Sequence, residues 1–151
     1  IYLTIYLVMN LGAFACIFMM KRESIFYENI KDLSGLSKNH PALALSFLII
    51  LFSLAGIPPL AGFFAKFYVF MAVIEANMYA LAIIGLVTTV VSAFYYLRII
   101  KIIYFDKPNK PFDESYDWGL KSSLILSSIL ILTYFIYPSI LTNVVYSIII
   151  Y

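Results

Sequence analysis

Hydrophobic residues fill 64% of the 151 positions and charged residues only 12%, with a mean hydropathy of +0.97. Because a soluble domain carries about 25% charged residues on its wet surface, this composition excludes an ordinary soluble domain and indicates a membrane protein. The net charge of +2 gives no reason to expect a nucleic-acid partner, and the single cysteine, Cys16, predicts neither a disulfide nor a metal cluster.

Four long apolar stretches are the predicted membrane-crossing elements. They lack the alternating pattern of a barrel strand and far exceed its length of about 10 residues, so helices are expected. The predicted fold is an all-α membrane protein forming one membrane-domain fragment over 1–151. Its helices are expected at residues 1–20, 41–74, 79–104 and 120–137, with an amphipathic segment over 139–151. The chain begins inside an apolar stretch without an initiator Met, so we expect a part of a longer protein.

Basic residues mark one side of the predicted bundle. Segment 21–40 holds four Lys or Arg residues, and the segment around 98–121 is also basic, whereas the turn at 75–78 has none. The positive-inside rule therefore predicts a multi-pass protein whose basic side faces the bacterial cytoplasm or the mitochondrial matrix. Arg98 and Lys101 are interpreted as anchors at that side.

The stretch 41–74 does not fit a bilayer as one continuous helix. At ~1.5 Å per residue it would be about 50 Å long, against ~30 Å of hydrocarbon. Its middle contains Gly56, Pro58, Pro59 and Gly62, and adjacent prolines remove helical hydrogen bonds while glycines permit unusual backbone angles. We expect a broken helix at 56–59, of the kind that forms ion sites in transporters. The alternative is a packing kink of a buried helix.

Lys66 is the predicted site of chemistry. It is the only Lys, Arg, His, Asp or Glu between His40 and Glu75, and charge at the bilayer centre costs ~2.5–3.5 kcal/mol on insertion scales. Burial favours the neutral amine, so a lysine there can release and take up a proton near neutral pH. The alternative is a structural lysine that extends its amine to the outer membrane interface.

Hydroxyl groups recur along the third predicted helix. Thr88, Ser92, Tyr95 and Tyr96 share one broad helical face. They are candidates for lining a hydrated proton path. The alternative is that they bond to a neighbouring helix or back to their own.

Several strings together resemble one protein family. They are YLVMNLGAF at 6–14, IKDLSGL at 30–36, FSLAGIPPLAGFFAKFY at 52–68, SAFYYLR at 92–98 and Tyr104-Phe105. The chain resembles the subunit N family of proton-pumping NADH–quinone oxidoreductase (respiratory complex I), called subunit two in mitochondria. The likeness covers nearly the whole chain and implies the C-terminal part of an antiporter-like inverted-repeat fold.

The resemblance also implies a function. The chain would be a proton-translocating, non-redox subunit with Lys66 as a protonatable station, partnered by the other membrane subunits of complex I and by the lipid bilayer. NADH, FMN, iron–sulfur clusters and quinone would bind in partner subunits, with no cofactor in this chain. The first repeat, with its glutamate and further lysines, is missing here. A subunit of a secondary cation/proton antiporter is the alternative, and a purely structural spacer is a third possibility.

Overall fold

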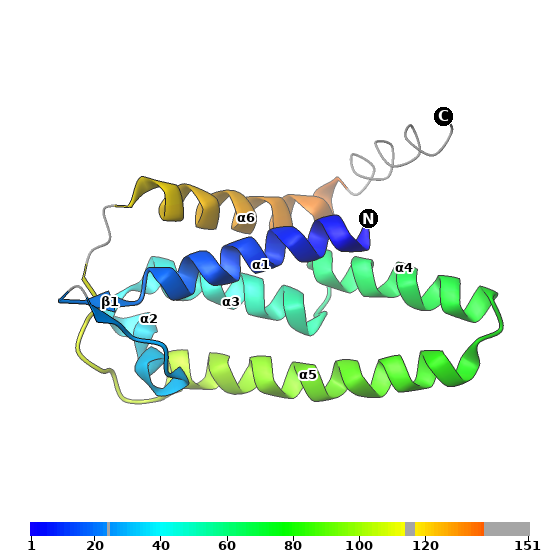
Figure 1. Ribbon diagram of the computed structural model, residues 1–151, viewed down its shortest axis with the longest axis horizontal. Helices are drawn as coiled ribbons and strands as arrows, with labels where there is room; N and C mark the ends of the chain where they lie inside the picture. Colours follow the sequence, from blue (N-terminus) through cyan, green and yellow to red (C-terminus); the bar gives the residue numbers. More distant parts are fainter. Residues whose placement is uncertain (24, 114–116, 138–151) are drawn as a thin grey trace.

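The computed structural model describes residues 1–23, 25–113 and 117–137, so the predicted amphipathic segment over 139–151 lies outside the described residues. Within them the chain is almost entirely helical, and its long helices lie roughly side by side along one axis (Figure 1). The elements are α1 (Tyr2–Phe18), β1 (Lys21–Arg22), β2 (Ile25–Phe26), the 3-10 helix η1 (Ile30–Leu33), α2 (Leu36–Asn39), α3 (Pro41–Ala55), α4 (Ala61–Glu75), α5 (Tyr79–Phe105) and α6 (Trp118–Ile136).

The helices form one bundle around a shared apolar core. α1 packs against α6, α3 and α4, and α5 runs along α3 and α4 (Figure 1). Ile50, Ile103 and Ile131, from α3, α5 and α6, are almost completely buried in this core. A Cβ added at Gly12 would lie 2.7 Å from Ile50 Cδ1 and 2.9 Å from Ser127 Cβ. Gly12 therefore lets α1 approach both neighbouring helices closely, as small residues do in membrane bundles.

The helices match the expected stretches to within a few residues at each end. The expected helix 41–74 is two helices, α3 and α4, separated by residues 56–60. Among the described residues, one helix, α5, is long and apolar enough to cross a membrane by itself, while α1, α3 and α6 are shorter apolar helices.

The two basic segments lie together at one end of the bundle (Figure 1). Arg22 donates hydrogen bonds to the carbonyls of Lys110 and Pro111, and its guanidinium lies over the rings of Tyr27 and Phe112, 4.5 and 5.2 Å from their centroids. The Phe112 backbone N–H donates to His40 Nε2 at 3.0 Å. The segments that the sequence treats as separate loops thus form one folded cap (residues 21–23 and 25–40 with 106–113).

Candidate functional site

The interruption between α3 and α4 begins at a glycine in the left-handed region. Gly56 has φ +84° and closes α3, while its N–H and that of Ile57 both donate to the Phe52 carbonyl at 3.1 and 3.0 Å. Pro58 and Pro59 lie inside the interruption. Gly62, which the sequence analysis assigned to the break, is instead the second residue of α4. The glycine and the prolines thus end α3 by the backbone effects expected of them.

Lys66 returns from α4 to the end of α3. Its Nζ donates to the Leu54 carbonyl at 2.8 Å and lies 3.4 Å from the Ala55 carbonyl. The last carbonyls of a helix have no partner within that helix and carry its negative dipole end. The half-buried amine of Lys66 therefore caps α3 with a positive charge.

Ser53 makes a second contact across the interruption. Its Oγ accepts a hydrogen bond from the Gly62 N–H at 3.0 Å and donates to Met9 Sδ at 3.0 Å. The Ser53 side chain is completely buried. The residue that precedes α4 is Leu60, whose side chain makes no capping hydrogen bond to that helix. A serine on α3 therefore satisfies one of the N–H groups at the start of α4.

A cavity of about 230 Å³ opens beside Lys66. Since water occupies about 30 Å³ per molecule in the liquid, several waters fit. Four helices line it, through Tyr2, Tyr6, Met9, Leu54, Gly62, Lys66, Thr88, Thr89, Ser92 and Tyr96. Most of the lining side chains carry polar atoms, so this is a space that water can occupy within an otherwise apolar bundle.

The structure brings together most of the expected site residues. Thr88, Ser92 and Tyr96 line the cavity with Lys66. Tyr95 is not among the lining residues, and its side chain is 56% exposed. The sequence analysis missed the residues that α1 contributes, above all the stacked pair Tyr2 and Tyr6, whose ring centroids lie 5.9 Å apart. No local sequence signal links them to Lys66, because the contact is tertiary.

The hydroxyl groups on α5 bond back to their own helix. Thr88 and Thr89 donate to the Gly85 carbonyl, and Ser92 donates to the Thr88 carbonyl, each at 2.9 Å. Their hydrogens are therefore engaged, and their oxygens remain able to accept hydrogen bonds from water in the cavity. Thr88 and Ser92 thus bond within their own helix and also line the cavity, and the proton path itself stays a prediction.

Lys66 carries the only charge among the described residues that line this cavity. Two influences act on it in opposite directions. Apolar surroundings disfavour the charged amine, whereas the carbonyl oxygens at the end of α3 stabilise it. The Lys66 amine thus lies where it contacts the helix-end carbonyls and also lines the polar cavity.

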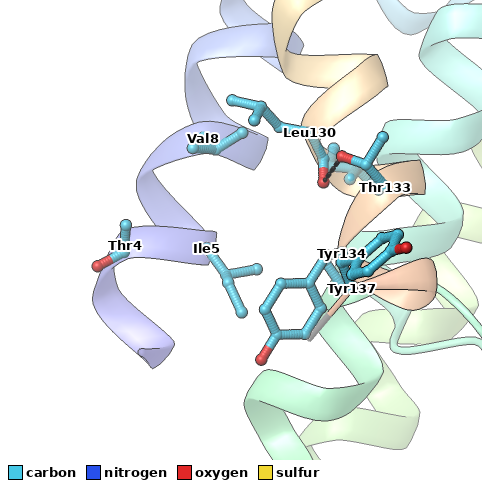
Figure 2. Close-up of a pocket in the computed structure, with 9 residues that line it drawn as sticks. Thr4, Ile5, Val8, Leu130, Thr133, Tyr134 and Tyr137 are labelled. Carbon is cyan, nitrogen blue, oxygen red and sulfur yellow. Dashed lines mark hydrogen bonds between the residues drawn. The ribbon is translucent and has the colours of Figure 1, made fainter. Parts of the chain in front are cut away.

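A second cavity, of about 190 Å³, lies between α1, α4 and α6 and has a different character (Figure 2). Ile5, Val8 and Leu130 give it an apolar wall, and the Thr133 hydroxyl donates to carbonyls of its own helix. No charged side chain of the described residues lines it. Nor do the described residues include a group of three or more His, Cys, Asp or Glu residues that could hold a metal. The cavity at Lys66 is therefore the candidate site.

Comparison with known proteins gives consistent relatives. The family described as NADH:quinone oxidoreductase/Mrp antiporter, transmembrane, matches residues 1–92. The chain is 63% identical over 145 residues to NADH-quinone oxidoreductase subunit N of Pelagibacter ubique, covering 96% of this chain and 31% of that protein. It is 53% identical over 139 residues to the subunit N of Parvibaculum lavamentivorans, covering 92% of this chain and 29% of that protein.

A solved structure shares the fold. A chain of respiratory complex I from Thermus thermophilus with bound aureothin matches with a TM-score of 0.78 and 31% identity, over 91% of this chain and 31% of that one. The chain thus spans about a third of the length of the relatives it matches. The family match covers more than half of the chain, from α1 through the Lys66 site into α5. The chain therefore belongs to the NADH:quinone oxidoreductase/Mrp antiporter transmembrane family.

Proposed function

We propose that this chain is part of a proton-translocating membrane subunit of an NADH–quinone oxidoreductase, in which Lys66 takes up and releases a proton. NADH oxidation and quinone reduction would take place in other subunits, and this chain would supply no redox centre. The observation that carries the proposal is the Lys66 amine, bound to the last carbonyls of α3 at the wall of a polar cavity. Relatives named as subunit N of this enzyme support the assignment.

The bundle suits a protein that crosses the membrane four times. The crossings are α1, the broken pair α3–α4, α5 and α6, with the folded cap on the cytoplasmic side. Apolar side chains such as Ile83, Val90 and Phe94 are 62–64% exposed on α5, which supports contact with lipid or with other membrane subunits of complex I. The bacterial relatives support a bacterial cytoplasmic membrane.

The geometry supplies the elements of a proton exchange. Bound to the Leu54 carbonyl, the amine has acceptors that stabilise its charge. A change in a neighbouring charge, elsewhere in the assembly, would shift the balance toward the neutral amine, so that the protonated amine gives its proton to water in the cavity and becomes neutral. The hydroxyl oxygens of Thr88 and Ser92 accept hydrogen bonds from that water and orient it. Alternation between the two states makes Lys66 a proton station.

Removal of the amine tests the proposal. In membrane vesicles that contain the whole assembly, Lys66→Ala should lower the number of protons pumped per NADH oxidised. An unchanged ratio, at equal assembly, would show that Lys66 is a structural lysine and that the chain does not use it to move protons.

The family description also names Mrp antiporters, so a subunit of a secondary cation/proton antiporter is the second candidate. Deletion of the gene distinguishes the two. Loss of NADH oxidation by the membranes supports the oxidoreductase. Intact NADH oxidation with loss of sodium tolerance supports the antiporter.

A further inference from the structure

Across the interruption, a side chain of each helix makes a hydrogen bond with a backbone group at the end of the other helix. Lys66 of α4 donates to the free carbonyls of α3, and Ser53 of α3 accepts from the Gly62 N–H of α4. Gly62 and Lys66 are four residues apart and so lie on the same face of α4, one turn from each other. Both contacts therefore join one face of α4 to the same end of α3.

The behaviour of Ser53 differs from that of other serines in this bundle. Ser92 and the buried Ser128 donate to carbonyls of their own helices, as helical serines commonly do. Ser53 donates instead to Met9 Sδ, which leaves its oxygen directed at Gly62. Its hydroxyl thus takes the place of the missing N-cap side chain of α4.

The close packing at Gly62 makes this contact sensitive to distance. A Cβ added at Gly62 would overlap the Ser53 backbone carbonyl, so α4 already lies in direct contact with α3 at this point. A shift of α4 along or away from α3 would be transmitted to Lys66 one turn later. Because a separation near 3.6 Å is no longer a hydrogen bond, a shift that lengthens the 2.8 Å contact beyond this limit would release the amine from Leu54.

We propose that Ser53 is a positioning residue for Lys66: its bond to Gly62 fixes α4 against the end of α3 and so holds the Lys66 amine on the Leu54 carbonyl. The proposal rests on the proton-exchange function proposed above. Met9 belongs to the same chain of contacts and also lines the cavity. The α1 helix is thereby joined to the interruption.

The substitutions Ser53→Thr and Ser53→Val test this role. Thr and Val have nearly the same shape, so any strain from the added methyl is shared, and only Thr retains the hydroxyl. We expect the Thr variant to pump near the wild-type number of protons per NADH and the Val variant to pump several-fold fewer. Cryo-electron microscopy of both assembled complexes should show Lys66 bound to Leu54 in the Thr variant and displaced in the Val variant.

The same pair at Ser128 serves as the control, because that serine is buried and its hydroxyl donates to the Leu124 carbonyl of its own helix, α6. There, Thr and Val should behave alike. Equal pumping and equal Lys66 positions in the two Ser53 variants, at equal assembly, would overturn the proposal. Displacement of Lys66 in the Val variant together with normal pumping by Lys66→Ala would uphold the positioning role and refute the proton station. If instead Lys66 stays in place in the Val variant and Lys66→Ala fails to pump, the positioning role is refuted and the proton station is upheld.

Discussion

Gly56, the glycine inside the interruption, should tolerate substitution poorly. It adopts φ +84°, and a left-handed conformation costs a residue with a Cβ about 1–2 kcal/mol. A Cβ there would also lie 3.2 Å from Lys66 Cδ and 3.4 Å from Nζ, so the lysine side chain must move by a few tenths of an ångström. Gly56→Ala should therefore both destabilise the interruption and disturb the contact of the amine with Leu54.

The expected loss of stability follows from the cost of placing a residue with a Cβ in the left-handed conformation. A loss of about 1–2 kcal/mol changes a folding equilibrium by roughly 5–30-fold. The assay is the fraction of the subunit that stays assembled after mild heating of the membranes, with proton pumping per NADH measured on the surviving complex. Gly85→Ala is the control: Gly85 lies within α5 and its added Cβ would meet only the edge of the Phe70 ring, at 3.1 Å. Equal stability of the Gly56 and Gly85 variants would refute the reasoning.

Three further substitutions test other parts of the structure. Tyr96→Phe should lower proton pumping because it removes a hydroxyl from a side chain that lines the cavity, whereas Tyr95→Phe should pump normally. Equal pumping by the two variants in membrane vesicles would contradict this. Gly12→Val should destabilise the bundle by about 1–3 kcal/mol through overpacking, which heating of the membranes should reveal as lost assembly. Arg22→Lys should loosen the folded cap, since lysine cannot reproduce the forked hydrogen bonds and ring contacts; unchanged proteolysis of the 106–113 segment would count against it.

The interruption could be predicted from the sequence because its causes are local. Gly56, Pro58 and Pro59 act through backbone angles and missing N–H donors, which do not depend on distant residues. Lys66 stood out by its isolation in an apolar stretch. The sequence could not reveal that its amine caps α3, because that contact depends on how two helices meet after the chain turns.

The residues that the sequence analysis missed are those that act at a distance. Ser53 looks like any helical serine until Gly62 is placed beside it. Tyr6 belongs to another helix, and no pattern in its neighbouring residues predicts that it lies near Lys66. Tyr95 and Tyr96 could not be separated by spacing, because neighbouring residues on a helix lie about 100° apart and a broad polar face accommodates both. The packing of α5 against α3 and α4 decides between them.

The role of Lys66 as a proton station is tested by the number of protons pumped per NADH oxidised by the Lys66→Arg complex in membrane vesicles. Arginine keeps the positive charge and the donors to the Leu54 carbonyl but does not release its proton at any working pH. Lys101→Arg provides the control, because Lys101 is exposed and pairs with Asp106 at 2.8 Å, an interaction that arginine can reproduce. We expect a much lower ratio for Lys66→Arg and a normal ratio for Lys101→Arg. A normal ratio in both variants, at equal assembly, would contradict this expectation.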